Sequence, residues 1–283
     1  MEGLSLYKVD LHCHSTASDG SLTPKELVRL AYRNRVKHLS LTDHDTVEGL
    51  QEARSEAKKL GINFINGIEV TADTSFLGEG KRQFHILGYH FNPESASMRE
   101  LTEFFQSSRV KRNKELLARL EELGYPITYE EMVKRYGENF GKPNVAKRLI
   151  ELGYFTDREE AIDFLSSLGV KREKMDYREV FKLIKEAGGI PVIAHPITLK
   201  LPKKELYCFI KRAKEEGLEG LEYLHYRHSP PYAREIRLIC QELKLYYTAG
   251  SDFHGENKPC IKLGFLNATR KDVNFPLTVS PLP

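Results

Sequence analysis

Short apolar runs alternate with amphipathic helical patterns along most of the chain. The apolar runs are bounded by turn-forming residues, which is typical of β-strands in a buried sheet. We expect seven strands, over residues 8–14, 38–44, 63–70, 84–90, 190–196, 217–224 and 246–254. Helical patterns occupy most of the connections between them. Such alternation predicts a mainly parallel sheet, either closed into a barrel or open and doubly wound.

The first connecting helix carries a complete start signal. Thr23, Pro24 and Glu26 match the N-cap, N1 and N3 positions of a capping box. The next helix is expected over residues 47–60, because Gly61 follows it at the position where helices commonly end. Three further helices are predicted, each preceding a strand, over residues 177–187, 202–216 and 231–243.

The segment from residue 93 to 176 interrupts this alternation. Its apolar residues recur with helical spacing, and no strand pattern stands out. We therefore predict a helical subdomain, serving as a lid, that is inserted into the barrel sequence. In this division, residues 1–92 form the first part of the barrel, 93–176 the insertion and 177–283 the second part.

Composition narrows the class of protein. With 283 residues, 40% hydrophobic and 29% charged, the chain has the size and balance of one large α/β domain, or of one domain plus a small insertion. No apolar stretch approaches the ~18–20 residues of a membrane helix, and no signal-peptide pattern opens the sequence. We therefore expect a cytoplasmic protein without membrane association. The net charge of +3 gives no support for a polyanionic partner, and no protein partner is evident.

Histidine and carboxylate residues gather at the predicted strand ends. His12 and His14 end the first strand, and Asp252 and His254 end the last. Residues at i and i+2 of a strand share one side, so each pair can chelate one ion. Carboxyl ends of parallel barrel strands meet at one rim, which would bring the pairs together. Further candidates at or near strand ends are Asp19, His44, Glu69, His85 and His195, of which His85 begins its strand and fits least well.

Mixed imidazole and carboxylate ligands suit Mn, Zn or Fe rather than Ca or Mg alone. A carboxylate such as Glu69 can bridge two ions, and two ions ~3.5–4 Å apart can activate water and stabilise a transferring phosphoryl group. A single histidine at a strand end is usually structural, but packing does not explain this whole set. We interpret it as a metal centre. Cys13 is expected to point to the other side of its strand, and His228 is equally well explained as a substrate contact or a structural residue.

Six stretches together resemble the PHP (polymerase and histidinol phosphatase) family, in particular its TrpH-like branch. They read DLHCHSTASDGSLTP (10–24), LTDHDTVEG (41–49), NGIEVTA (66–72), FHILGYHF (84–91), AGGIPVIAHP (187–196) and GSDFHGENKP (250–259). The resemblance implies an α/β fold, a distorted seven-stranded (β/α)7 TIM-like barrel. It also implies a trinuclear metal cluster and a phosphoric ester hydrolase (EC 3.1) in which a metal-bound hydroxide attacks.

The same resemblance divides the metal ligands among the ions, with Glu69 as a bridge. The implied sets are His12, His14, Glu69 and Asp252 for the first ion, Asp19, His44 and His195 for the second, and Glu69, His85 and His254 for the third.

Members of this branch resemble phosphatases of 3′,5′-bisphosphate nucleotides, so the expected reaction removes a 3′-phosphate and leaves a 5′-nucleotide. The alternatives are a 5′–3′ exoribonuclease on short RNA and a histidinol-phosphate phosphatase. A non-enzymatic PHP scaffold is less favoured, because every ligand position is filled. An amidohydrolase is less favoured too, because many of those enzymes carry a bridging lysine where this chain has Glu69.

In the family, the insertion carries basic residues that bind a second phosphate or the nucleoside. The corresponding stretch is SSRVKRNKELLARL, in which Arg109, Arg112 and Asn113 share one helical face. A solvated basic face is the alternative explanation. A second family contact usually resembles Gly-Arg-Pro-His, but residues 141–144 read Gly-Lys-Pro-Asn. Lys142 and Asn144 remain predicted substrate contacts. However, the ammonium of Lys142 stands where the family has a bidentate guanidinium, and the amide of Asn144 stands where it has a titratable imidazole.

Overall fold

The chain folds into two compact units. A computed structural model describes residues 7–78, 83–138 and 140–278. The barrel unit comprises Met1–Thr102 and Met175–Pro283, and the helical unit comprises Glu103–Lys174. The helical unit starts later than the predicted residue 93, because helix α3 (Ala96–Glu122) begins in the barrel unit and continues into the helical unit.

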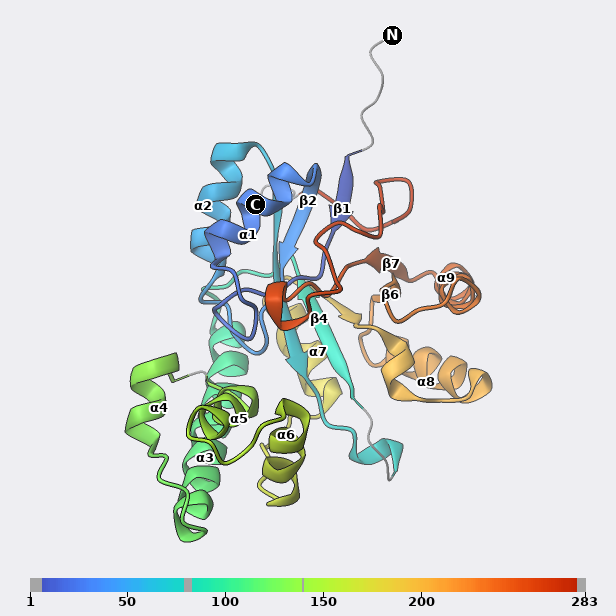
Figure 1. Ribbon diagram of the computed structural model, residues 1–283. Helices are drawn as coiled ribbons and strands as arrows, with labels where there is room; N and C mark the ends of the chain where they lie inside the picture. Colours follow the sequence, from blue (N-terminus) through green and yellow to red (C-terminus); the bar gives the residue numbers. More distant parts are fainter. Residues whose placement is uncertain (1–6, 79–82, 139, 279–283) are drawn as a thin grey trace. The chain divides into compact units, whose positions relative to one another are not determined.

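All seven predicted strands are present, most of them shorter than expected. They are β1 (Lys8–Asp10), β2 (Val36–Leu41), β3 (Asn63–Thr71), β4 (His85–Tyr89), β5 (Ile190–Ile193), β6 (Gly220–Leu224) and β7 (Tyr246–Ala249). They form one sheet in the order of the sequence, β1 to β7 (Figure 1). Inward-facing apolar residues, among them Val9, Ile65 and Val192, fill its interior.

Strand β4 runs antiparallel to both of its neighbours, whereas the other pairs are parallel. Thr71 at the end of β3 pairs with His85 at the start of β4. His85 therefore lies at the same rim as the carboxyl ends of the parallel strands. The reversed direction of β4 explains how His85 reaches this rim although it begins its strand.

The sheet nearly closes into a barrel where the chain continues beyond β1 and β7. The backbone N–H of Leu11 donates to Ala249 O at 3.0 Å, and that of Asp252 donates to His12 O at 2.8 Å. The N–H of His14 donates to Phe253 O at 2.9 Å. These bonds place the His12–His14 pair beside the Asp252–His254 pair, as a closed barrel requires.

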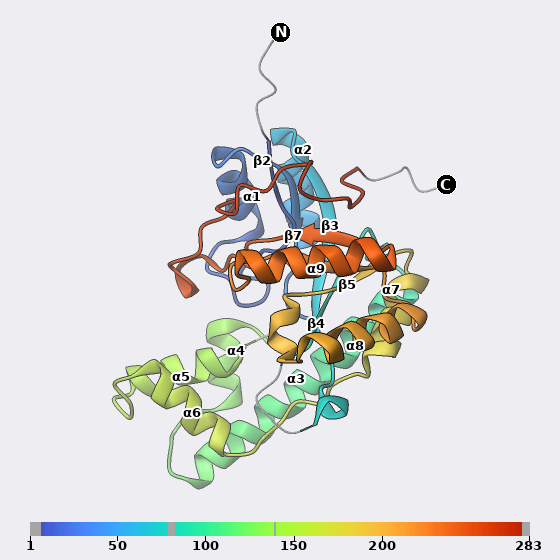
Figure 2. The ribbon, with the colours of Figure 1, turned by 90° about the vertical axis from the view of Figure 1, so that its right-hand side faces the viewer.

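Helices cover the outside of the barrel. Helix α1 (Pro24–Arg33) has the predicted capping box, with Thr23 and Glu26 bonded reciprocally. Helix α2 begins later than expected (Leu50–Leu60) and ends at Gly61, whose φ of 63° is left-handed. Helices α7 (Tyr177–Glu186), α8 (Lys203–Glu215) and α9 (Pro230–Leu243) follow the predictions, and α9 lies against β6 and β7 (Figure 2).

The helical unit has its own core. After α3 it contains α4 (Tyr129–Tyr136), α5 (Lys142–Glu151) and α6 (Arg158–Ser167), and no strand occurs in its described residues. Leu116, Met132, Leu149 and Leu165 are buried together between these helices. Its role as a lid stays a prediction. No helix in the described parts of the chain is both long and apolar enough to cross a bilayer.

Candidate metal centre

Glu69, at the end of β3, lies at the middle of the histidine cluster and is 1% exposed. Its Oε2 lies 3.2 Å from His12 Nε2, from His14 Nε2 and from His44 Nδ1. Its Oε1 lies 2.8 Å from His85 Nδ1 and 3.0 Å from His195 Nε2. The two oxygens of one carboxylate thus face different imidazoles, an arrangement suited to bridging two ions.

Asp252 completes a second face of the cluster. Its Oδ1 lies 3.3 Å from His14 Nε2, 3.6 Å from His12 Nε2 and 3.4 Å from His254 Nδ1. One potential ligand atom from each of His12, His14, Glu69 and Asp252 falls within 4.8 Å of the others. These four residues are those predicted for the first ion.

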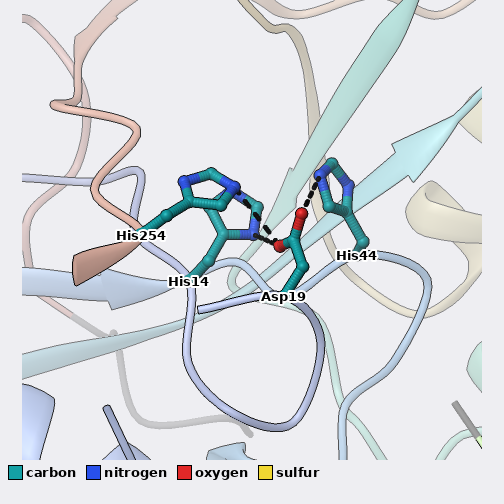
Figure 3. Close-up of side chains that lie close together, drawn as sticks. All are labelled: His14, Asp19, His44 and His254. Carbon is teal, nitrogen blue, oxygen red and sulfur yellow. Dashed lines mark ion pairs between the residues drawn. The ribbon is translucent and has the colours of Figure 1, made fainter. Parts of the chain in front are cut away.

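A further group surrounds Asp19, which projects from the loop after β1 (Figure 3). Its Oδ1 lies 3.3 Å from His254 Nε2 and 3.6 Å from His14 Nδ1, and its Oδ2 lies 3.9 Å from His44 Nε2. A third group joins His44, Glu69 and His85. All nine predicted ligands therefore belong to one connected cluster.

Two histidines lie beside different members of the cluster from those with which the predicted sets group them. His254, expected beside His85, lies beside Asp19. His195, expected beside Asp19, lies with His85 at Glu69 Oε1. The topology explains the exchange, because His195 follows β5, the neighbour of β4, whereas the segment after β7 pairs with the one after β1.

The donor atoms fit divalent metal ions. Among the described residues, His12 Nε2, both ring nitrogens of His14 and His44 Nδ1 are buried without a hydrogen bond. A buried polar atom without a partner is costly, so several at one point indicate a ligand. Imidazole nitrogens mixed with carboxylate oxygens are the ligands that Mn, Zn and Fe prefer. The residues present therefore fit the metal centre that the sequence predicts.

The buried carboxylates and imidazoles of the cluster shift one another's pKa values in different directions. Burial lowers the pKa of His44 to about 3 and that of His195 to about 4, so both rings are neutral. Burial also opposes a charge on His14, but Asp252 and Glu69 outweigh it and raise that pKa to about 9. The pKa of Glu69 falls below its usual value despite burial, because His44, His12 and His85 surround it. Its carboxylate is ionised.

Two predicted ligands have backbone conformations that non-glycine residues rarely adopt. His195 has a φ of 24° and Asp252 a φ of 57°. Such conformations cost on the order of 1–3 kcal/mol each and are concentrated at functional sites. The barrel thus holds these two side chains in place at the expense of local strain.

Sequence reasoning missed three residues that touch the ligands. Glu222 in β6 is fully buried and accepts hydrogen bonds from His12 Nδ1 at 3.0 Å and from the His195 backbone N–H at 2.8 Å. His225 Nε2 lies 3.4 Å from Asp252 Oδ2, and Lys258 Nζ lies 2.8 Å from the same oxygen. The sequence feature that could have identified Glu222 is a single carboxylate within an otherwise apolar strand, which indicates a buried partner for it.

Other polar residues of the barrel unit have structural partners. Cys13 points away from the cluster, as predicted, and its Sγ donates to Ser40 O at 3.1 Å. Asp43 accepts from the Ser15 N–H at 2.7 Å and from the Ser18 hydroxyl at 2.6 Å, which steadies the loop that carries Asp19. His228 Nδ1 donates to Tyr223 O at 2.8 Å, and its role as a substrate contact stays a prediction.

The remaining predicted substrate contacts belong to the helical unit. Arg112 is 8% exposed, and its Nε forms no hydrogen bond with any described residue. Burial and then the charges of Arg109 and Arg172 lower its pKa to about 10. Asn113 is buried, and its amide donates to Phe140 O at 2.9 Å.

Helix α5 carries the last two of these residues. Asn144 accepts from the Gly141 N–H at 2.8 Å and so caps the helix, and Lys142 Nζ lies 3.3 Å from Ser166 Oγ. Substrate contact by either one stays a prediction.

Comparisons with known proteins agree on one family. A family model described as the PHP domain matches residues 10–163. A 5′-3′ exoribonuclease of Haemophilus influenzae is 34% identical over 263 residues, which cover 91% of this chain and 93% of that protein. A 3′,5′-nucleoside bisphosphate phosphatase of Chromobacterium violaceum is 29% identical, with 87% of each chain covered. A solved structure from Bifidobacterium adolescentis, described as a metal-dependent phosphoesterase, has a TM-score of 0.77 and 29% identity over 93% of this chain and 92% of that one.

Proposed function

Because this chain belongs to the PHP-domain family, we propose that it removes the 3′-phosphate from a 3′,5′-bisphosphate nucleotide and leaves a 5′-nucleotide. The chain is a phosphoric ester hydrolase. The observation that carries the proposal is the ring of imidazoles around Glu69. Several of their nitrogens are buried and have no hydrogen bond within the described part of the chain.

Nine side chains would hold two or three divalent ions of Mn, Zn or Fe. The distances support the following sets: His12, His14, Glu69 and Asp252 for one ion, Asp19, His44 and His254 for another, and Glu69, His85 and His195 for a third. When bound, such ions would acidify water and neutralise negative charge on the phosphoryl group.

The side chains of the cluster differ in exposure, which indicates the direction from which a phosphate would approach. Those of His12, His14 and Glu69 are at most 1% exposed, whereas Asp19 is 49% and His44 20% exposed. The buried residues form the floor, and Asp19 and His44 border the open side. A phosphate that enters there would first meet Asp19 and His44, two members of one proposed set.

A buried cation in the helical unit is suited to bind an anion, and we propose that this anion is the second phosphate of the substrate. Arg112 lies among other guanidinium groups, close enough for Arg109 and Arg172 to lower its pKa. A guanidinium favours bidentate contacts with phosphate oxygens, and the buried Nε of Arg112 has no hydrogen bond among the described residues. A bound anion would offset the repulsion among these guanidinium groups and would accept a hydrogen bond from Arg112 Nε. A bisphosphate supplies that anion, whereas histidinol phosphate has only one phosphate.

The alternative is a 5′–3′ exoribonuclease, which is the activity named for the Haemophilus relative. Metal-free protein should be reconstituted with Mn²⁺ and assayed separately on adenosine 3′,5′-bisphosphate, a short 5′-phosphorylated RNA and histidinol phosphate. We expect the highest kcat/KM on the bisphosphate, with AMP and phosphate as products. Preferential release of mononucleotides from RNA would replace the proposal with the exoribonuclease, and preference for histidinol phosphate would reject both.

A further inference from the structure

A lysine lies at the edge of the metal centre. Lys258 follows the short 3-10 helix η3 (Gly255–Asn257), and its Nζ lies 2.8 Å from Asp252 Oδ2. Its side chain is 31% exposed, whereas that of Asp252 is 6% exposed. The ammonium group therefore spans the boundary between the buried ligands and the open surface.

The two oxygens of Asp252 have separate surroundings. Oδ1 faces His12, His14 and His254, the imidazoles of the cluster. Oδ2 faces Lys258 and His225. His225 Nδ1 accepts from the Arg227 N–H at 3.2 Å, so in the neutral ring the proton is on Nε2, which points at Asp252. Asp252 Oδ2 thus has an imidazole N–H that can orient it, and the lysine adds a positive charge beside that oxygen.

The charge of Lys258 is unusual at this site. In the described ranges 7–78, 83–138 and 140–278, no other lysine or arginine forms an ion pair with Asp19, Glu69 or Asp252. An ammonium has three N–H donors, and the contact with Asp252 uses one of them. Partial exposure leaves the others able to reach an anion at the open side.

We propose that Lys258 donates a hydrogen bond to a phosphoryl oxygen of the ester bound at the metal centre. This inference rests on the proposed function, because it requires a phosphate at the cluster. The contact is electrostatic, and no proton is transferred. It would add a protein cation to the neutralisation of the phosphoryl group, a role that charge-assisted hydrogen bonds serve well.

The competing explanation is that Lys258 only holds Asp252 in place. The two explanations predict opposite changes in metal binding when the charge is removed. A phosphate contact can be lost without harm to the ligands, and the more negative cluster should bind Mn²⁺ equally well or more tightly. A purely positioning lysine would leave Asp252 less ordered, and Mn²⁺ binding should weaken.

The test compares Lys258→Met, which keeps an aliphatic stem, with Lys262→Met, a change at an exposed lysine nearby. Calorimetry should measure binding of Mn²⁺ to metal-free protein and of inorganic phosphate to Mn²⁺-loaded protein. For Lys258→Met we expect phosphate to bind about ten- to a hundredfold more weakly, with Mn²⁺ binding undiminished. Lys258→Arg should recover part of the phosphate affinity, and Lys262→Met should match the wild type.

Unchanged phosphate affinity in Lys258→Met would overturn the inference, and so would a loss that excess Mn²⁺ repairs. The phosphate measurement is independent of turnover. If the wild type hydrolysed no phosphoester while Lys258→Met still weakened phosphate binding, the proposed function would fail and this contact would stand. If the wild type were active and phosphate affinity did not change, the contact alone would fail.

Discussion

His12 Nδ1 lies 3.0 Å from Oε1 of Glu222, a carboxylate that is fully buried inside the barrel. The carboxylate accepts a hydrogen bond from the Nδ1–H group and thereby orients the ring, which places Nε2 beside Glu69 and Asp252. The other oxygen of Glu222 accepts the backbone N–H of His195. One carboxylate therefore orients two predicted ligands on different sides of the cluster.

Glu222→Gln should weaken metal binding without unfolding the protein. The amide keeps the volume but has one oxygen for two donors, so either His12 or the His195 backbone loses its acceptor. Loss of such a partner typically costs about ten- to a hundredfold in metal affinity. Titration of metal-free protein with Mn²⁺ would measure it, with the half-exposed Glu219→Gln as control. Equal affinity in both variants would show that Glu222 does not orient the ligands.

His14→Ala and Asp252→Ala should abolish turnover, because each removes a ligand atom from the centre of the cluster. We expect kcat/KM to fall by more than about a hundredfold, beyond the usual effect of an outer partner, and the bound metal per chain to decrease. His38→Ala is the matched control, since His38 contacts Asn63 instead. Full activity in either variant would show that the replaced side chain is not a metal ligand.

Arg112→Met should raise KM for bisphosphates more than KM for simple phosphate esters. If Arg112 contacts the second phosphate, KM for adenosine 3′,5′-bisphosphate should rise by roughly ten- to a hundredfold, while p-nitrophenyl phosphate is affected little. Lys111→Met is the control, because Lys111 is exposed on the same helix and pairs with Glu173. An equal loss on both substrates would count against a second-phosphate contact. Circular dichroism should verify that the helical unit remains folded.

Gly250→Ala should disturb the centre through packing alone. A Cβ at Gly250 would lie 2.2 Å from His12 Cβ and 2.8 Å from Glu222 Oε1. Overpacking of this kind typically costs about 1–3 kcal/mol, so we expect a Tm lower by several degrees and weaker Mn²⁺ binding. In Gly141→Ala, the nearest contact would be a side-chain carbon of Pro143 at 3.3 Å. Comparable Tm values for the two variants would refute the packing argument.

The strands, and the residues that gather in the histidine and carboxylate cluster, could be predicted from the sequence because both follow from local patterns. Apolar runs locate the seven strands, and His-x-His and Asp-x-His at strand ends identify chelating pairs. Strand direction is not local, however. Nothing in residues 84–90 reveals that β4 runs backwards, which is why His85 seemed misplaced.

The division of ligands among the ions also depends on which strands are neighbours. His195 meets His85 because β5 pairs with β4, and His254 meets Asp19 because the barrel closes between the first and last strands. The contact of Glu222 with His12 could not be predicted from the sequence for another reason. A single acid within an apolar strand does not show which buried ring it contacts 210 residues away.

The most direct test titrates metal-free protein with Mn²⁺ and follows bound metal and phosphate release from adenosine 3′,5′-bisphosphate in the same samples. The account predicts two or three ions per chain, no release without metal, and activity that rises as these sites fill. Full phosphate release from metal-free protein in the presence of a chelator would contradict it. So would saturation at two or three ions with no hydrolysis of this substrate.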